Sequence, residues 1–363
     1  MKTIFVIGQI MSGKNILWKL LDGHSKIVVS AVHTNFALHF LKKNVQEYYL
    51  NRKNLPFKKD KEKLNFITLK ISNKIKIDLT IGEYFESLYK FTNYRTFLTL
   101  ARNNCIITNN KELENDYNDW EFDIIKFEEE IFKRLFSTKK EIAFSEFFLE
   151  TQKIYCNVVQ RNVEEIEYFV EPIENETYFF RLIDENLNNY KIISTFRDDI
   201  DLIYANFKRT NSFEKKYNFY NFLFLKRNIN IIKFLNQYNF YKKRIYNFHQ
   251  FLKSYEKKED VHFVKFEDLI LNTKKTMQNI CKYLNIDFEN ILLKLSANGI
   301  ELIETKPTLT QINDSAKEFF NETEIKRVKN FYSKFKPNII YFKILVFYLI
   351  VKIYFSQLFK VKL

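Results

Sequence analysis

Cysteine is scarce in this sequence, which contains only Cys105, Cys156 and Cys281 among 363 residues. The number is odd and the three positions are far apart, which argues against a disulfide framework and against a cysteine-rich metal site. Reduced, buried thiols are therefore expected. Glycine (5) and proline (4) are also few, and no internal repeat or low-complexity linker interrupts the chain.

The sequence also has no long segment in which all charged residues are basic or all are acidic. It has 58 Lys and Arg against 44 Asp and Glu, a formal charge of +14, but the basic residues are scattered among acidic ones. No zinc-finger spacing and no RNP-like motif is present, so no nucleic-acid partner is expected. The excess charge favours an anionic partner such as a nucleotide, an anionic glycan or a lipid surface, without choosing among them.

Apolar residues, in contrast, are abundant. Hydrophobic residues make up 46% of the chain and aromatic ones 17%, enough for a substantial core. Strand-like and helix-like patterns alternate: residues 3–8, 27–30, 191–196 and 261–266 as strands, and residues 13–22, 201–255 and 273–284 as helices. The pattern predicts an α/β fold with a doubly wound, mostly parallel sheet over residues 1–335, carrying a helical insertion over about 36–190.

The two ends of the chain bear on its location. The N-terminus has one Lys and then an apolar run that enters a glycine loop, so it resembles a first β-strand and not a signal peptide, and a cytoplasmic location is expected. Residues 338–359 are strongly apolar but contain Lys343 and Lys352. For residues 336–363 we expect an apolar C-terminal helix that is buried or packs on a partner, while peripheral attachment to a membrane surface and spanning stay open.

The stretch VIGQIMSGKN lies between the first predicted strand and helix, where phosphate-binding loops occur. Gly8, Gly13 and Lys14 fit the pattern G-x-x-x-x-G-K-[ST], but Asn15 replaces the hydroxyl residue that coordinates magnesium. A P-loop kinase or NTPase that uses ATP or GTP is therefore one open interpretation. Against it, no predicted strand ends clearly in a magnesium-binding Asp, and Asp198 is the nearest candidate.

The same loop continues into LLDGH, and the two together resemble the sulfotransferase family that uses 3′-phosphoadenylyl sulfate (PAPS), in its carbohydrate and bacterial branches. The family loop reads G-x-P-[RK]-S-G-[TS]-[TS]-x-L. Gly8, Ser12, Gly13 and Leu17 match it. The proline, the basic residue and both hydroxyl residues of the family are replaced, by Ile10, Met11, Lys14 and Asn15.

Later segments resemble the same family in the same order. KIISTFRDDID is similar to the family's strand that ends in R-D-P-R-D, with Arg197, Asp198 and Asp201 in place. Glu171 stands near the Lys of a K-T-P-x-N segment, and Ala205 stands where the family usually has a Ser on the 3′-phosphate.

Two further segments complete the resemblance. The matching segments together cover roughly half of the chain and are spread along nearly all of it. VHFVKFEDL is similar to V-x-Y-E-D-L, a segment whose paired acids, here Glu267 and Asp268, are structural in the family. KPTLTQINDSAKEF resembles a shortened form of the P-T-x-x-G…N-S loop that closes over the nucleotide.

The resemblance implies sulfuryl transfer from PAPS to a hydroxyl of a glycan or another saccharide-containing acceptor, with no metal. The implied cofactor-binding residues are Gly8, Ser12, Gly13, Lys14, Asn15, Arg197 and Asn206. Lys14 would also act in catalysis, as a relocated replacement for the cation missing at Met11. Arg197 would hold the 3′-phosphate by bidentate contact, with Asn206 in place of the hydroxyl missing at Ala205.

A base for the acceptor hydroxyl is expected among the histidines. His33 follows the second predicted strand, where the carbohydrate branch commonly has a Glu, and the pKa of histidine near neutrality suits proton abstraction. His39 is the reserve candidate. His24 belongs to the LLDGH turn, where capping or packing is the better interpretation.

A third class of function also stays open, that of a sulfotransferase-fold protein that binds a partner or nucleotide without transferring a group. Its support is the set of family side chains that this sequence replaces, at Met11, Asn15, Glu171 and Ala205.

Overall fold

The structure is a computed structural model that describes residues 1–9, 11–30, 68–72, 77–80, 84, 124–173, 187–202, 204–205, 248, 250, 253–255, 259–297 and 300–301. The chain divides into two compact units, one of Met1–Gly8, Gly13–Thr195 and Lys258–Pro307, the other of Gln9–Ser12, Phe196–Lys257 and Thr308–Leu363.

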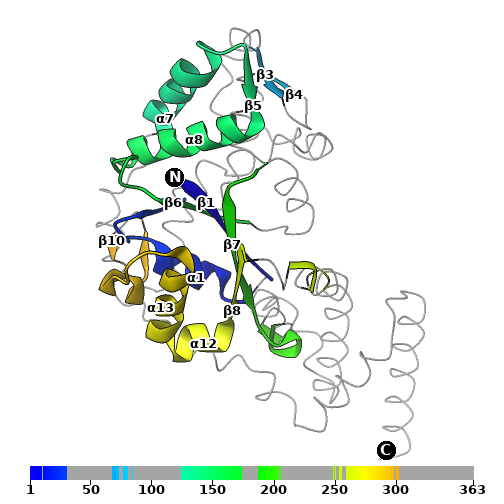
Figure 1. Ribbon diagram of the computed structural model, residues 1–363, viewed down its shortest axis with the longest axis vertical. Helices are drawn as coiled ribbons and strands as arrows, with labels where there is room; N and C mark the ends of the chain where they lie inside the picture. Colours follow the sequence, from blue (N-terminus) through cyan, green and yellow to red (C-terminus); the bar gives the residue numbers. More distant parts are fainter. Residues whose placement is uncertain are drawn as a thin grey trace, which may run out of the picture. The chain divides into compact units, whose positions relative to one another are not determined.

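The first unit is built on a five-stranded sheet in the order β2-β6-β1-β7-β8 (Figure 1). The strands are β1 (Lys2–Gly8), β2 (Ile27–Val29), β6 (Tyr168–Pro172), β7 (Tyr190–Phe196) and β8 (Val261–Lys265). Strands β6 and β7 both pair with β1 in parallel, and β2 pairs with β6 in parallel. The predicted α/β fold with a mostly parallel sheet is thus confirmed.

Helices cover both faces of this sheet, with α1, α12 and α13 on one side and α8 on the other, while α7 packs on α8 (Figure 1). Their bounds are α1 (Lys14–Leu21), α7 (Ile124–Ile131), α8 (Phe144–Val158), α12 (Phe266–Leu271) and α13 (Thr273–Leu284). A sheet covered on both faces needs apolar residues at successive positions, which explains why β1 reads as an unbroken apolar run.

Alternate residues of β1 pack on the two helical layers. Ile4 and Val6 join a core cluster with Leu17 of α1, and all three side chains are fully buried. On the other face the ring of Phe5 lies 6.0 Å from that of Phe148 in α8, measured between centroids. Burial of such a side chain stabilises the fold by about 1.5–3 kcal/mol.

The segment expected as a helical insertion also contains strands, among them β6 of the central sheet. The other described elements are β3 (Thr68–Ser72), β4 (Ile77–Thr80), β5 (Glu141–Ala143), β9 (Ser296–Ala297), β10 (Ile300–Glu301), a π-helix η4 (Phe132–Phe136) and a 3-10 helix η6 (Asn290–Leu293). Strand β3 pairs with β4 antiparallel and with β5 in parallel. The alternation of apolar and polar residues in TLKIS is a strand signal that would have predicted β3.

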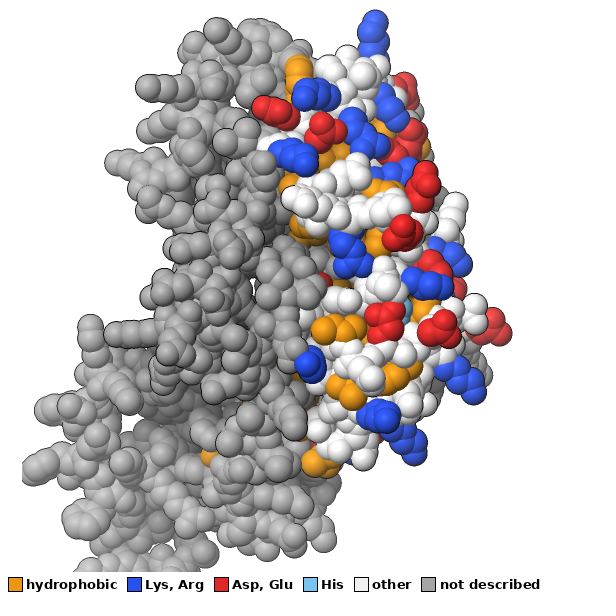
Figure 2. Space-filling model, turned by 90° about the vertical axis from the view of Figure 1, so that its left-hand side faces the viewer, with side chains coloured by type: hydrophobic (Ala, Val, Ile, Leu, Met, Phe, Trp, Pro, Cys, Tyr) orange, Lys and Arg blue, Asp and Glu red, His pale blue; other side chains and the backbone are white. Residues whose placement is uncertain are grey.

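Several residues and segments for which the sequence predicts a role lie outside the described residues: Cys105, His33, His39, Asn206, residues 306–319 and residues 336–363. Within the described residues, no helix has the length and apolarity needed to cross a membrane. Cys156 and Cys281 are free and buried as expected, and burial raises the pKa of the Cys281 thiol to about 11. On the face drawn in Figure 2, the described basic and acidic side chains are interspersed.

Candidate nucleotide-binding site

Strands β1 and β7 mark the point of the sheet where the strand order reverses. They are neighbours in parallel register, with Gly8 opposite Thr195 near their carboxyl ends. From β1 the chain continues to β2 on one side of the sheet, and from β7 it continues to β8 on the other. Open α/β sheets bind ligands outside the carboxyl ends of strands at such a point. The loops after Gly8 and after Phe196 are therefore the expected binding loops.

The loop after β1 begins with a tight turn over residues 9 to 12. The backbone N–H and the hydroxyl of Ser12 both donate to the carbonyl oxygen of Gln9, at 3.1 and 2.7 Å. Met11 has a φ of 71°, in the left-handed region that non-glycine residues seldom adopt. A positive φ at the third residue is typical of type II turns.

Gly13 ends the loop and precedes helix α1, and two features require glycine there. Its φ is 90°, and a Cβ atom added to it would lie 2.5 Å from the Cδ2 of Phe266 in α12. Its carbonyl oxygen accepts the N–H groups of Ile16 and Leu17, both at 3.0 Å. No side chain caps the start of α1, and its first turn holds no acidic residue. Such a helix start, with its partial positive charge, favours an anionic ligand.

Lys14 is the first residue of α1 and is buried, with 7% of its surface exposed. Its Nζ donates to the carbonyl oxygen of Ile173, directly after β6, at 2.8 Å. Burial of an ammonium group requires such an acceptor. The structure therefore holds this cation at the carboxyl edge of the sheet and not in solvent. Asn15, the next residue, is exposed.

Arg197 follows β7 directly and is also buried, with 6% of its surface exposed. The next residue, Asp198, accepts the N–H of Ile200 through Oδ1 at 3.0 Å, and its carbonyl oxygen accepts the N–H of Leu202 at 2.9 Å. Asp198 thus caps the short helical segment after β7.

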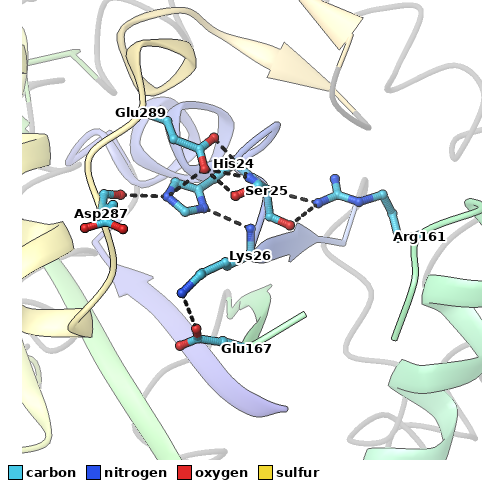
Figure 3. A network of polar contacts seen from close by, with 7 residues as sticks. All are labelled: His24, Ser25, Lys26, Arg161, Glu167, Asp287 and Glu289. Carbon is cyan, nitrogen blue, oxygen red and sulfur yellow. Dashed lines mark hydrogen bonds and ion pairs between the residues drawn. The ribbon is translucent and has the colours of Figure 1, made fainter. Parts of the chain in front are cut away.

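His24, in the LLDGH turn, lies in a network of polar contacts (Figure 3). Its Nδ1 accepts the backbone N–H of Lys26 at 3.0 Å, and its Nε2 lies 2.9 Å from the carbonyl oxygen of Asp287 and 3.5 Å from Oε1 of Glu289. A backbone N–H can only donate, so Nδ1 carries no proton and Nε2 donates to Asp287. The structure thus gives His24 the packing role expected of it.

The same turn also binds Arg161, from the segment after α8. The Arg161 guanidinium donates to the carbonyl oxygens of His24 and Ser25, at 3.0 and 2.8 Å (Figure 3). The backbone N–H of Ser25 donates to Glu289 Oε2 at 3.1 Å. The LLDGH turn therefore joins segments that lie more than 130 residues apart in the chain.

The sequence model of the sulfotransferase family matches residues 3–290, which include the glycine loop, the LLDGH turn and the strand before Arg197. The chain belongs to the sulfotransferase family. Among curated proteins, none matches it in sequence.

Solved structures similar to this chain are distant in sequence. They include the sulfotransferase domain from the curacin biosynthetic pathway, at 15% identity over 91% of this chain and 96% of that chain, with a TM-score of 0.42. The sulfotransferase domain from the Synechococcus PCC 7002 olefin synthase has 13% identity over 99% and 95%, with a TM-score of 0.40. Sulfotransferase STF9 from Mycobacterium avium has 12% identity over 88% and 77%, with a TM-score of 0.35. The family assignment rests on the sequence match.

Two buried polar residues have no role predicted from the sequence. Gln9 stands at the variable second position of the loop pattern, and Glu171 was noted only as a departure from the family's Lys. Among the described residues, neither the Gln9 amide nor the Glu171 carboxyl has a hydrogen-bond partner. Glu171 is fully buried, and burial raises its pKa well above the ordinary value. For Glu171, the sequence signal was an acidic residue within the otherwise apolar segment YFVEP.

Proposed function

We propose that this sulfotransferase moves a sulfuryl group from PAPS to a hydroxyl of a glycan or another saccharide-containing acceptor. The observation that carries the proposal is the strained glycine loop between β1 and α1, at the same sheet edge as the end of β7, where buried Arg197 follows. PAPS has two separate anionic groups, a 5′-phosphosulfate and a 3′-phosphate. A helix start suits the first, and an arginine suits the second.

Sulfuryl transfer requires the enzyme to position the donor and the acceptor and to stabilise the charge that develops on the leaving phosphate. In sulfuryl transfer the acceptor oxygen bonds to sulfur while the bond from sulfur to the bridging oxygen of the donor breaks, which leaves negative charge on the departing phosphate. Lys14 would stabilise that charge, and its hydrogen bond to Ile173 holds the ammonium at the sheet edge in advance. His33, with His39 in reserve, is the proposed base that takes the acceptor's proton.

The saccharide acceptor is supported by the LLDGH resemblance to the carbohydrate branch and by the net charge of +14, which suits an anionic glycan. Mass spectrometry of cell-surface glycans from cells with and without the gene would test it. The expected result is a sulfated species that disappears with the gene. An unchanged sulfated glycan profile would contradict a saccharide acceptor.

Calorimetric titration separates the three classes of function. We expect 3′,5′-adenosine bisphosphate, the product of the donor, to bind in the presence of EDTA. Binding of ATP only with magnesium would support the kinase or NTPase interpretation. Binding of neither nucleotide would support a fold relative without transfer activity.

A variant of Arg197 tests the 3′-phosphate site. Arg197→Ala should weaken the binding of 3′,5′-adenosine bisphosphate by roughly a hundredfold, because a buried charge-assisted contact is lost. Adenosine 5′-monophosphate, which lacks the 3′-phosphate, serves as the matched ligand and should bind the variant and the wild type alike. A variant that still prefers the bisphosphate over the monophosphate would show that Arg197 does not hold the 3′-phosphate.

A further inference from the structure

Gln9 follows the last residue of β1 and opens the phosphate loop. Its main chain is used by the turn, because its carbonyl oxygen accepts both bonds from Ser12. Its side chain is not used in this way. Only 8% of Gln9 is exposed, yet neither Oε1 nor Nε2 has a hydrogen-bond partner in the described part of the chain.

A buried amide without partners is unfavourable. Leaving it unpaired destabilises the folded protein relative to a satisfied amide, because the group has lost its hydrogen bonds to water. An apolar side chain of the same length would avoid this cost without disturbing the turn, since the turn depends on the Gln9 main chain. The polar side chain therefore makes the free protein less stable than it needs to be.

The same turn carries a second unfavourable feature. Met11 has a left-handed φ of 71°, which is an unfavourable conformation for a residue with a side chain. Backbone strain and unpaired buried polar groups persist together mainly where a ligand uses them. Both occur here within three residues, directly before the start of α1.

We propose that the Gln9 side chain is a specificity-determining contact to the donor nucleotide, with Nε2 donating to an anionic oxygen of its phosphosulfate end. The contact rests on the proposed function above, which supplies the ligand. It also fits the loss of the family's basic residue at Met11, because a neutral amide supplies a donor to oxygens that have lost a cationic partner. The anionic oxygen belongs either to the 5′-phosphate or to the sulfuryl group.

The variant Gln9→Met tests this contact, because methionine has a similar length and no hydrogen-bonding amide. Titration should show an affinity for PAPS about ten- to a hundredfold weaker than wild type. The affinity for 3′,5′-adenosine bisphosphate should fall as well if the contacted oxygen belongs to the 5′-phosphate. The Tm of the free protein should rise, because the unpaired amide is gone. A structural role for the amide would instead lower the Tm and leave both affinities unchanged.

Gln152 provides a matched control on helix α8. It is fully buried, its Nε2 also lacks a hydrogen-bond partner among the described residues, and its Oε1 accepts the hydroxyl of Thr3 at 3.0 Å. Gln152→Met should leave both nucleotide affinities unchanged. A second variant, Gln9→Glu, keeps the shape and adds a negative charge, so it should weaken binding more than Gln9→Met does.

The two ligands separate the sources of the anionic oxygen. Weakening of both affinities by Gln9→Met assigns the contact to the 5′-phosphate, and weakening for PAPS alone assigns it to the sulfuryl group. Unchanged affinity for both ligands overturns the contact while the proposed function stands. A wild-type protein that binds neither ligand overturns the proposed function itself.

Discussion

Glu171 is a carboxylic acid inside a parallel sheet. It lies on β6 opposite Phe5 of β1, it is fully buried, and among the described residues its two carboxyl oxygens have no hydrogen-bond partner. Burial raises its pKa well above the ordinary value. Burial also raises the pKa of the Tyr84 hydroxyl. Glu171 is therefore neutral in the folded protein at pH values where it is ionised in the unfolded chain.

This difference sets a pH dependence of stability. Below the unfolded pKa of about 4.3 both states are protonated, and above it the unfolded state gains stability by up to about 1.4 kcal/mol per pH unit until the folded pKa is reached. Glu171→Gln should therefore raise the Tm near pH 8 and flatten its fall with pH. Thermal unfolding at several pH values measures this. Parallel curves for wild type and variant would mean that Glu171 ionises normally in the folded state.

Lys14 is a second residue whose surroundings point to a role. Lys14→Ala should lower the rate of sulfuryl transfer by roughly a hundred- to a thousandfold, because the cation that we propose for the leaving phosphate is lost. Lys19→Ala, in the last turn of the same helix, is the control for lost charge and should have little effect. The measurement is the release of 3′,5′-adenosine bisphosphate from PAPS. Equal rates for Lys14→Ala and wild type would refute the catalytic assignment.

Among the elements, helix α1 and the glycine before it tie the phosphate loop to α12. Gly13→Ala should lower the free energy of unfolding by about 2–5 kcal/mol, because the added Cβ meets the Phe266 ring and the left-handed backbone is strained. Phe266→Leu in the same chain should recover part of that loss. Chemical unfolding of the two single variants and the double variant measures the coupling. If the losses of stability in the two single variants simply add in the double variant, the Phe266 ring does not cause the strain at position 13.

The elements also differ in how well the sequence predicts them. Strands β1 and β7 and helix α13 lie close to their predicted ranges, because each is an apolar run or an amphipathic repeat bounded by clear breaks. Strand β6 was not predicted, since YFVEP is short and contains a Glu and a Pro. Its place between β1 and β2 depends on pairing with residues far away in the chain.

At the scale of the whole molecule, the net charge of +14 should speed the approach of an anionic nucleotide. The association rate of 3′,5′-adenosine bisphosphate should fall severalfold when ionic strength rises from about 50 to 300 mM, since screening shortens the reach of the charge. Stopped-flow binding measures this rate, with uncharged adenosine as the control ligand. A salt-independent rate would mean that the bulk charge does not steer the ligand.

The family could be derived from the sequence alone, because its evidence is local. The strand, glycine loop and helix at the N-terminus, the LLDGH turn and the RDD motif each lie within a few neighbouring residues, and the order of the motifs follows the chain. From these came the mostly parallel fold, the phosphate loop and the candidate residues Lys14 and Arg197.

Which polar side chains are buried, and what they contact, could be learned only from the folded structure. Lys14 meets Ile173 across 159 positions of sequence, and His24 meets Asp287 across 263. In the described part of the chain, the side chains of Gln9 and Glu171 lack a hydrogen-bond partner, which the sequence also did not indicate. Burial and hydrogen-bond pairing depend on segments that are distant in the chain and meet only when it folds, so no local pattern reports them.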